Sequence, residues 1–223
     1  MTRYGFRQAL GGFFLARSST LQSLLPSGLH PHDVRPAHGV LAITAFDFVH
    51  SEVGPYGELV LSVLVPPFAQ RGNPLPHAAW FPIALATTTP ASRAHATERW
   101  LLPNYERCFD IDFLRQGSRR SVVLRDSGQD ILRLDVERRR PAPATRLYQA
   151  FSAQQGRVYR VNLHISGELD EHQDETGRLE LHHHEFTTRL DDILIDDAPI
   201  AEQSMESGEQ RFADLEPHTL EQT

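Results

Sequence analysis

The stretch that decides the fold is residues 40–65, VLAITAFDFVHSEVGPYGELVLSVLV, in which two apolar segments flank a turn. Both segments, 40–49 and 59–65, are rich in the β-branched and aromatic residues that strands favour. Between them, Gly54 and Pro55 supply the backbone conformations that tight turns require. The stretch therefore predicts two neighbouring strands joined by a short connection.

Similar apolar runs recur along the rest of the chain, at 80–88, 121–124, 131–136, 158–165 and 179–190. The second and third of these runs flank Asp126-Ser127-Gly128, a sequence typical of the turn in a β-hairpin. Many strands at short spacing, without a strand–helix–strand rhythm, are typical of closed antiparallel sheets. The chain is therefore predicted to be mainly β, an antiparallel barrel with a few short helices.

One short helix is predicted near the N-terminus. In Ser19-Thr20-Leu21-Gln22 a serine precedes a glutamine by three residues, which is the pattern of a capping box, and Pro26 then ends the helix. Residues 1–32 also contain no acidic residue, which weakly resembles a targeting segment. Because Arg17 interrupts the apolar run and no clear cleavage site follows, a folded first segment is the favoured interpretation.

The length and the end of the chain indicate how it is divided. At 223 residues the chain can bury one sizeable core, and residues 1–195 are predicted to form a single barrel domain. Residues 196–223 are acidic and weakly apolar, which predicts a mobile tail or a partner-dependent arm. The polar segment 167–177 is predicted to be a hairpin loop.

The composition argues against several kinds of partner. A net charge of -7 with a pI near 5.9 disfavours nucleic acid and anionic membranes. Cys108 is the only cysteine, so no internal disulfide forms and no oxidising compartment is required. No apolar run approaches the roughly 20 residues of a membrane helix. We therefore expect a cytoplasmic protein with neither nucleic acid nor membrane among its partners.

Three short motifs occur in a fixed order: residues 24–29 read LLPSGL, residues 54–58 read GPYGE, and Glu98 precedes Pro103 by five residues. In order and spacing these motifs resemble the acetoacetate decarboxylase-like family, best over residues 21–136. The resemblance implies a cone-like antiparallel β-barrel, a large homo-oligomer and a pocket for small keto acids. It also implies catalysis through a lysine that forms a Schiff base with the carbonyl of the substrate.

The chain departs from that family at the lysine itself. It contains no lysine, so all 22 of its Lys and Arg side chains are arginine. Asn104 and Tyr105 stand where the family has its two lysines. A carbonyl forms no imine with an asparagine amide or, at neutral pH, with a guanidinium. The resemblance therefore implies the barrel and the pocket, whereas no side chain of this chain can form the Schiff base.

Three residues are predicted to be catalytic: Glu58, Asn104 and Tyr105. A carboxylate inside an apolar barrel would have a raised pKa and could act as a general acid or base, which is the role expected of Glu58. At the rim of the barrel it would instead be a solvated carboxylate. Asn104 and Tyr105 would donate hydrogen bonds to a carbonyl or enolate oxygen, or would simply form a turn after Pro103.

Four further residues are predicted to contact the substrate: Arg7, Tyr56, Glu98 and Trp100. The resemblance places Arg7 near the arginine that pairs with the substrate carboxylate in the family. Tyr56 belongs to the GPYGE motif, and Glu98 and Trp100 could present a carboxylate and an aromatic wall. The alternative is a core position for Trp100 with Arg99 in a surface ion pair.

The leading hypothesis is a protein that binds a small or medium carbonyl or carboxylic compound and acts on it without a cofactor or a covalent bond. The reaction would be an enolisation, isomerisation, cyclisation, dehydration or imine-free decarboxylation. A non-catalytic ligand-binding or scaffold protein on the same fold is the first alternative. The second is a metal-dependent enzyme in which Glu180, His182 and His184 share a strand face, with His164 or His172 as a further ligand. No specific motif supports a metal, so none is expected.

Overall fold

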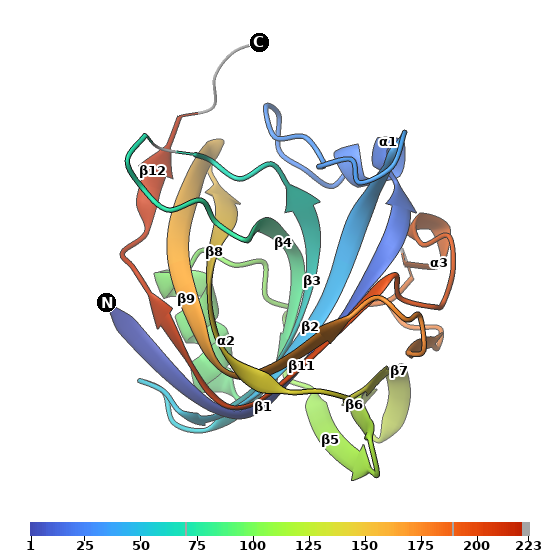
Figure 1. The fold of residues 1–223 in the computed structure, drawn as a ribbon. Coiled ribbons are helices and arrows are strands. Elements are labelled where there is room, and N and C mark those ends of the chain that lie inside the picture. The colour runs from blue at the N-terminus through green and yellow to red at the C-terminus, as the bar shows by residue number, and fades with distance from the viewer. Residues whose placement is uncertain (70, 189, 220–223) are drawn as a thin grey trace.

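The computed structural model describes residues 1–69, 71–188 and 190–219, and its centre is a closed β-barrel. The strand order around the barrel is β11–β1–β2–β3–β4–β8–β9, and a pairing between β9 and β11 closes the ring (Figure 1). The barrel strands are β1 (Thr2–Arg17), β2 (His38–His50), β3 (Tyr56–Val65), β4 (Ala78–Thr87), β8 (Ala142–Gln154), β9 (Arg157–His172) and β11 (Ala201–Phe212).

The barrel is antiparallel at every pairing except one. Strands β4 and β8 run parallel, with residues 78–80 opposite 148–150. Parallel neighbours need a long crossover connection, and the chain between β4 and β8 supplies one, because it contains a helix and three strands. The prediction of a mainly β, antiparallel barrel with short helices is confirmed, with this single parallel pairing as the difference.

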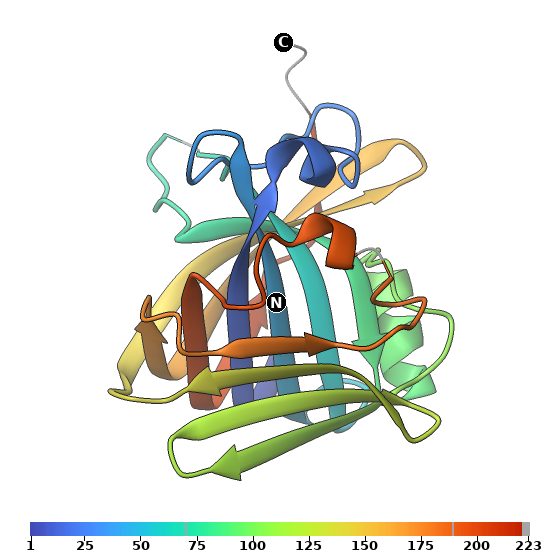
Figure 2. The ribbon, with the colours of Figure 1, turned by 90° about the vertical axis from the view of Figure 1, so that its right-hand side faces the viewer.

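A second sheet lies across the outside of the barrel. Its strand order is β10–β7–β6–β5, and Figure 2 shows its strands running across those of the barrel. The predicted turn joins β6 to β7, and the positive φ angles of Ser127 (51°) and Gly128 (82°) are typical of the turn in a tight hairpin. The strands are β5 (Asp110–Gln116), β6 (Arg119–Asp126), β7 (Gln129–Glu137) and β10 (Arg178–Leu181).

The larger hydrophobic core lies between the barrel wall and this second sheet. Phe14 and Leu41 of the barrel belong to the same buried cluster as Val122 of β6. The opposite face of the barrel strands lines the interior, so the wall is covered on both faces. This explains why residues 40–49 and 59–65 are almost continuously apolar, whereas a strand with one solvated face would alternate.

Among the residues that the structure describes, three short helices and one short strand complete the fold. They are α1 (Ser18–Gln22), α2 (Pro90–Arg99), α3 (Leu190–Ile193) and β12 (Glu216–His218). Helix α2 was not predicted, because residues 90–99 contain no apolar run and begin with a proline. The proline occupies the first turn of α2, and the Thr89 side chain caps the helix by accepting a 3.1 Å hydrogen bond from the N–H of Ser92.

Helix α1 was predicted, but its capping box is not formed. The helix begins at Ser18, two residues earlier than the motif requires, and its N-cap residue Arg17 makes no side-chain capping bond. The Gln22 amide instead donates a 2.9 Å hydrogen bond to the backbone oxygen of Leu29. The side chain therefore secures the loop after the helix and does not cap its start.

The C-terminal third differs most from its prediction. Residues 196–223 were expected to be a tail outside a domain of residues 1–195, whereas Ala201–Phe212 forms β11, which pairs with both β1 and β9. The barrel therefore closes only with this segment, and residues 220–223 lie outside the described part. The predicted loop 167–177 is shorter, because β9 continues to His172. The predicted strand 179–190 is also shorter, because β10 ends at Leu181.

In the part of the chain that the structure describes, no helix combines the length and the apolar character that crossing a bilayer requires.

Candidate active site

The barrel encloses a cavity with about 140 Å³ of space for the centres of water molecules. This is roughly ten times the space that one buried water needs, so a small organic molecule fits. The polar side chains on its wall are those of Thr44, Glu58, Ser62, Gln149, Ser152 and Gln210. The wall is otherwise apolar, and its phenylalanine, tryptophan and tyrosine residues are Phe13, Phe46, Trp80, Trp100, Tyr148, Phe151 and Phe212.

Strand β3 places Glu58 on the wall of this cavity. Side chains alternate along a strand, so Glu58 shares the inner face with Tyr56, while Gly57 lies against Ile111 of the second sheet. Burial raises the pKa of Glu58 to about 7, and a 3.5 Å hydrogen bond from the Tyr56 hydroxyl opposes part of that rise. The geometry favours the interior position over the solvated rim.

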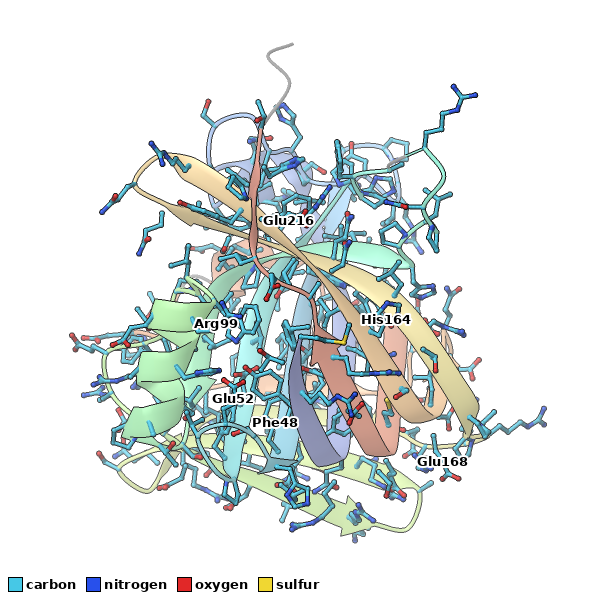
Figure 3. The ribbon with its side chains drawn as sticks, turned by 90° about the vertical axis from the view of Figure 1, so that its left-hand side faces the viewer. Phe48, Glu52, Arg99, His164, Glu168 and Glu216 are labelled. Atoms are coloured by element: carbon cyan, nitrogen blue, oxygen red, sulfur yellow. The ribbon has the colours of Figure 1, made fainter. Side chains whose placement is uncertain are left out.

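Aromatic side chains form a buried cluster around Trp100 at the cavity wall. Trp100 lines the cavity, and its Nε1–H donates a 2.7 Å hydrogen bond to the hydroxyl of Tyr4, which also lies 2.6 Å from Nε2 of His95 on α2. Tyr4 in turn packs against Phe48, with ring centroids 5.5 Å apart. Figure 3 shows this side of the molecule, with Phe48 and Arg99 labelled. The network fixes the orientation of Trp100 on the cavity wall.

Asn104 lies behind the cavity wall. The chain around it runs beside β4, where the N–H of Tyr105 donates a 2.8 Å hydrogen bond to the backbone oxygen of Leu85. The Asn104 amide reaches Oγ1 of Thr87 at 3.5 Å, and Thr87 is the cross-strand partner of Glu58. Its own Oδ1 is buried without a hydrogen-bond partner among the described residues. Asn104 therefore contacts Thr87, which pairs with Glu58 on the neighbouring strand, but Asn104 itself does not line the cavity.

Tyr105 lies away from the cavity. Its hydroxyl donates a hydrogen bond to Glu185, and its ring packs against Phe109 and Phe186, with ring centroids 5.2 and 5.9 Å apart. None of these residues lines the cavity. The oxyanion role predicted for Tyr105 would therefore require a different arrangement of residues 103–105.

Arg7 and Glu98 are also outside the cavity. The Arg7 side chain is 64% exposed and pairs with Asp47 at 3.2 Å. Glu98 is exposed on α2, while its neighbour Arg99 lies over the Trp100 ring and pairs with Asp214 at 3.3 Å. Of the four predicted substrate contacts, the structure thus brings together Tyr56 and Trp100 and separates the other two.

Two residues of the wall show what could and could not be found in the sequence. Ser62 follows Glu58 by four residues on β3, so the period of a strand would have placed both side chains on one face. Gln210 belongs to β11, which was predicted to be a tail, and nothing local in the sequence distinguishes it. The Gln210 side chain is 4% exposed and makes no hydrogen bond to other described residues.

The histidines at 182–184 do not share a strand face, because β10 ends at Leu181. His184 Nε2 lies 3.0 Å from Oδ2 of Asp126, which also pairs with Arg107 at 2.6 Å. Within residues 1–69, 71–188 and 190–219, no group of three or more His, Cys, Asp or Glu side chains is arranged to hold a metal ion. The arrangement on which the metal hypothesis depended is therefore not formed.

These features define a closed β-barrel with a mostly apolar cavity that has the carboxyl group of Glu58 on its wall. Solved structures with the same architecture are those of acetoacetate decarboxylase and related enzymes, which confirms at the level of the fold the resemblance found in the sequence. No protein-family model matches the chain, and a search of curated proteins finds no significant match.

Three solved structures illustrate the likeness. The enduracididine biosynthesis enzyme MppR, solved with pyruvate, has a TM-score of 0.67 at 10% identity, over 99% of this chain and 91% of that one. Acetoacetate decarboxylase from Legionella pneumophila has a TM-score of 0.64 at 15% identity, over 98% and 88%. An acetoacetate decarboxylase-like enzyme from Sphingomonas wittichii RW1 has a TM-score of 0.56 at 18% identity, over 98% and 93%. At these identities the likeness establishes the fold alone.

Proposed function

We propose that this chain binds a carbonyl compound inside the barrel and acts on it without a covalent intermediate, using Glu58 as general acid and base. The observation that carries the proposal is the carboxyl group of Glu58 on the wall of an apolar cavity, with its pKa raised to about 7 by burial. A group with a pKa near the working pH is suited both to accept and to return a proton.

The chemistry follows from the groups on the wall. Ionised Glu58 removes a proton from the carbon beside the carbonyl, and the electron pair of the broken C–H bond moves to the carbonyl oxygen. The enolate oxygen then accepts hydrogen bonds from neutral donors, for which Gln210 and Ser62 are available in the same cavity. Return of the proton to another atom completes an isomerisation, and its transfer to a departing hydroxide completes a dehydration.

Asn104 takes a different role in this proposal from the one expected of it. The Asn104 amide donates a hydrogen bond to Thr87, which pairs with Glu58 on the adjacent strand. Asn104 therefore acts as a positioning residue and does not touch the substrate. Imine-free decarboxylation is the least supported reaction. It releases an electron pair that oxyanion donors alone must stabilise, and each missing donor costs about 3 kcal/mol in the transition state.

The structural relatives support a carbonyl ligand by analogy. MppR was solved with pyruvate and also with the condensation product of pyruvate and imidazole 4-carboxaldehyde. Pyruvate is a keto acid, and the second ligand is a product formed from it. The proposal carries over the ligand class and not the lysine-dependent step, since this chain contains no lysine.

The test is exchange of the hydrogens beside the carbonyl in D₂O, followed by mass spectrometry on a panel of small ketones and keto acids. The wild-type protein should accelerate exchange for at least one compound, and Glu58→Gln should reduce that rate by about a hundredfold or more, as expected for a lost general base. The matched control is Glu98→Gln, because Glu98 is exposed on α2. Equal rates for wild type and Glu58→Gln would contradict the proposal.

A non-catalytic binding protein is the second candidate, and the mostly apolar wall of the cavity is the observation that favours it. The same experiment separates the two candidates, because a binding protein would take up a ligand without accelerating exchange.

The homo-oligomer implied by the resemblance is proposed as well. Strand β5 ends the order of the second sheet and so offers a free edge for another chain. Light scattering coupled to size-exclusion chromatography tests it, and a monomer would contradict it.

A further inference from the structure

We infer that the cavity selects an uncharged carbonyl compound, and that Gln210 of β11 recognises a neutral polar group of that compound, a carboxamide or a hydroxyl. This inference rests on the proposed function and names the substrate class of the same site. It departs from the resemblance, which implies a pocket for small keto acids, because keto acids are anions at neutral pH.

The wall of the cavity offers an anion no positive side chain. Among the lining residues that the structure describes, the ionisable side chains are those of Glu58 and Tyr148, and burial keeps the Tyr148 hydroxyl neutral by raising its pKa. Arg7 is 64% exposed and pairs with Asp47 outside the cavity. Arg146 acts on the pKa of Tyr148 but is not among the lining residues. A ligand carboxylate would therefore lack a countercharge on the wall.

Glu58 makes the cavity unfavourable for a second negative charge. In a 2-keto acid the carboxylate is attached to the carbonyl carbon, next to the carbon that Glu58 is proposed to deprotonate. Once Glu58 is ionised, the two carboxylates repel each other at close range in an apolar environment, and the ligand also loses its hydration. An uncharged ligand avoids both costs and leaves Glu58 able to ionise and act as a base.

Neutral polar side chains on the wall have no partner within the protein. Gln210 and Ser62 are only 4% and 5% exposed, yet neither side chain makes a hydrogen bond to another described residue. The polar atoms of these two side chains are not enclosed by protein atoms, so they reach the open space of the cavity that both residues line. A buried amide or hydroxyl without a hydrogen bond is costly, which indicates that the partners come from outside the chain.

The two glutamines on the wall differ in this respect. The Gln149 amide donates a 3.0 Å hydrogen bond to the backbone oxygen of Phe68 and accepts a 2.8 Å bond from the N–H of the same residue. Gln149 therefore holds a loop, whereas the Gln210 amide offers both its donors and its acceptor to a ligand. A carboxamide or a hydroxyl matches it, because each can donate and accept. A carboxylate only accepts, and it would face the Gln210 oxygen with a negative charge.

The strand order separates this amide from the reacting end of the site. Ser62 shares the inner face of β3 with Glu58, so its hydroxyl serves the reacting carbonyl. Gln210 belongs to β11, which β1 and β2 separate from β3. Gln210 and Glu58 thus approach the ligand from different sides of the barrel, and the wall between them is mostly apolar. The ligand that fits carries an enolisable carbonyl, an apolar body and one neutral polar group.

The first test compares benzylpyruvate with its carboxamide, two probes of nearly equal size that differ in charge, by isothermal titration calorimetry at pH 8. Glu58 is then mostly ionised, because its pKa is about 7, and the wild type should bind the carboxamide about tenfold or more tightly than the acid. Glu58→Gln should reduce that preference by about threefold or more. The inference is overturned if the acid binds as tightly as the carboxamide, if Glu58→Gln leaves the preference unchanged, or if the carboxamide does not bind at about 1 mM.

The second test examines Gln210 itself. Gln210→Leu should weaken the carboxamide by about fivefold or more, and it should change the binding of benzylacetone, which lacks the second polar group, by less than about threefold. Gln129→Leu, at the exposed start of β7, is the matched control and should alter neither. Gln210→Leu should also melt at or above the wild-type temperature, because it removes an unbonded buried amide. Equal weakening of both probes, or a melting temperature lower by several degrees, would overturn the role of Gln210.

Failure of the proposed function is distinguishable from failure of this inference. A protein that prefers the carboxamide to the acid but accelerates no hydrogen exchange beside the carbonyl would keep the uncharged ligand and lose the proposed chemistry. A protein that accelerates exchange for keto acids and not for their carboxamides would keep the chemistry and overturn the inference.

Discussion

The hydroxyl of Tyr56 donates a 3.5 Å hydrogen bond to Oε2 of Glu58, two residues further along β3 and inside the barrel. The bond is long, so burial prevails and the pKa of Glu58 rises from 4.5 to about 7. Between these two pH values the folded chain holds a proton that the unfolded chain has released. The stability that depends on this proton is complete below pH 4.5 and is lost as the pH rises through 7.

Glu58→Gln should therefore gain stability relative to the wild type as the pH rises from 5 to 8. The amide stays neutral, whereas the wild-type carboxyl must ionise in an apolar cavity, and the relative gain should reach about 2–3 kcal/mol. Urea unfolding at both pH values measures it. Glu98→Gln should show no such change, because Glu98 is exposed on α2. A difference between Glu58→Gln and the wild type that does not vary with pH would show that the carboxyl titrates normally.

The hydrogen bond between Trp100 and Tyr4 should be measurable as a coupling free energy. Nε1 of Trp100 lies 2.7 Å from the Tyr4 hydroxyl, and both residues are buried. A double-mutant cycle with Trp100→Phe and Tyr4→Phe, measured by urea unfolding, should give a coupling of about 1 kcal/mol. Strict additivity of the two substitutions would mean that the bond contributes nothing to folding, and the anchoring of Trp100 on the cavity wall would then need another cause.

Borohydride reduction in the presence of acetoacetate should leave no adduct on any side chain of the wild-type protein. No side chain carries a primary amine, so only the chain terminus can form an imine. Intact mass spectrometry before and after blocking of the terminal amine reads the result. Asn104→Lys is the matched variant, because it restores an amine at the position where the resemblance implies one. A stable adduct on a blocked wild-type chain would refute the non-covalent mechanism.

Much of the N-terminal half of the barrel was predictable because its strands carry their own signals. Residues 40–49 and 59–65 fall within β2 and β3, since a wall buried on both faces requires continuous apolar sequence. The GPYGE motif marks the start of β3, whereas the sequence leaves the Glu58 side chain either inside the barrel or at its rim, and the assembled barrel places it on the cavity wall. The two strands depend on a few neighbouring residues, which is why the sequence alone indicates them.

The C-terminal half was less predictable because its signals are distant in sequence. Strand β11, AEQSMESGEQRF, has only three apolar residues, Ala201, Met205 and Phe212, and its strand conformation depends on pairing with β1 on one side and β9 on the other. Gln210 reaches the cavity wall only because β11 pairs with β9, where its cross-strand partner Ile165 lines the same cavity. Exposure of Arg7 and the position of Tyr105 likewise depend on the assembled barrel and on no local pattern.

Removal of β11 should therefore abolish the fold. A chain that ends at residue 195 would leave β1 and β9 with free edges and would open the cavity, so we expect an aggregated or unfolded product. A chain that ends at Thr219 keeps every strand of the structure and should melt cooperatively. Circular dichroism and size-exclusion chromatography compare the two. A folded, soluble product ending at residue 195 would restore the prediction of a dispensable tail.

The carboxylate of Glu202 shows how an acidic strand can be buried, and it gives the last prediction. The side chain is 0% exposed, and its two oxygens accept hydrogen bonds from the backbone N–H groups of Glu137, Thr176 and Gly177 at 2.6–2.8 Å. Glu202→Gln replaces one accepting oxygen with a donor that faces another donor, so it should destabilise the fold by about 2–4 kcal/mol in urea unfolding. Glu209→Gln is the matched control on the same strand. Its side chain is 39% exposed and should cost less than about 1 kcal/mol. Equal losses for the two variants would mean that the buried bonds do not hold β11 in the barrel.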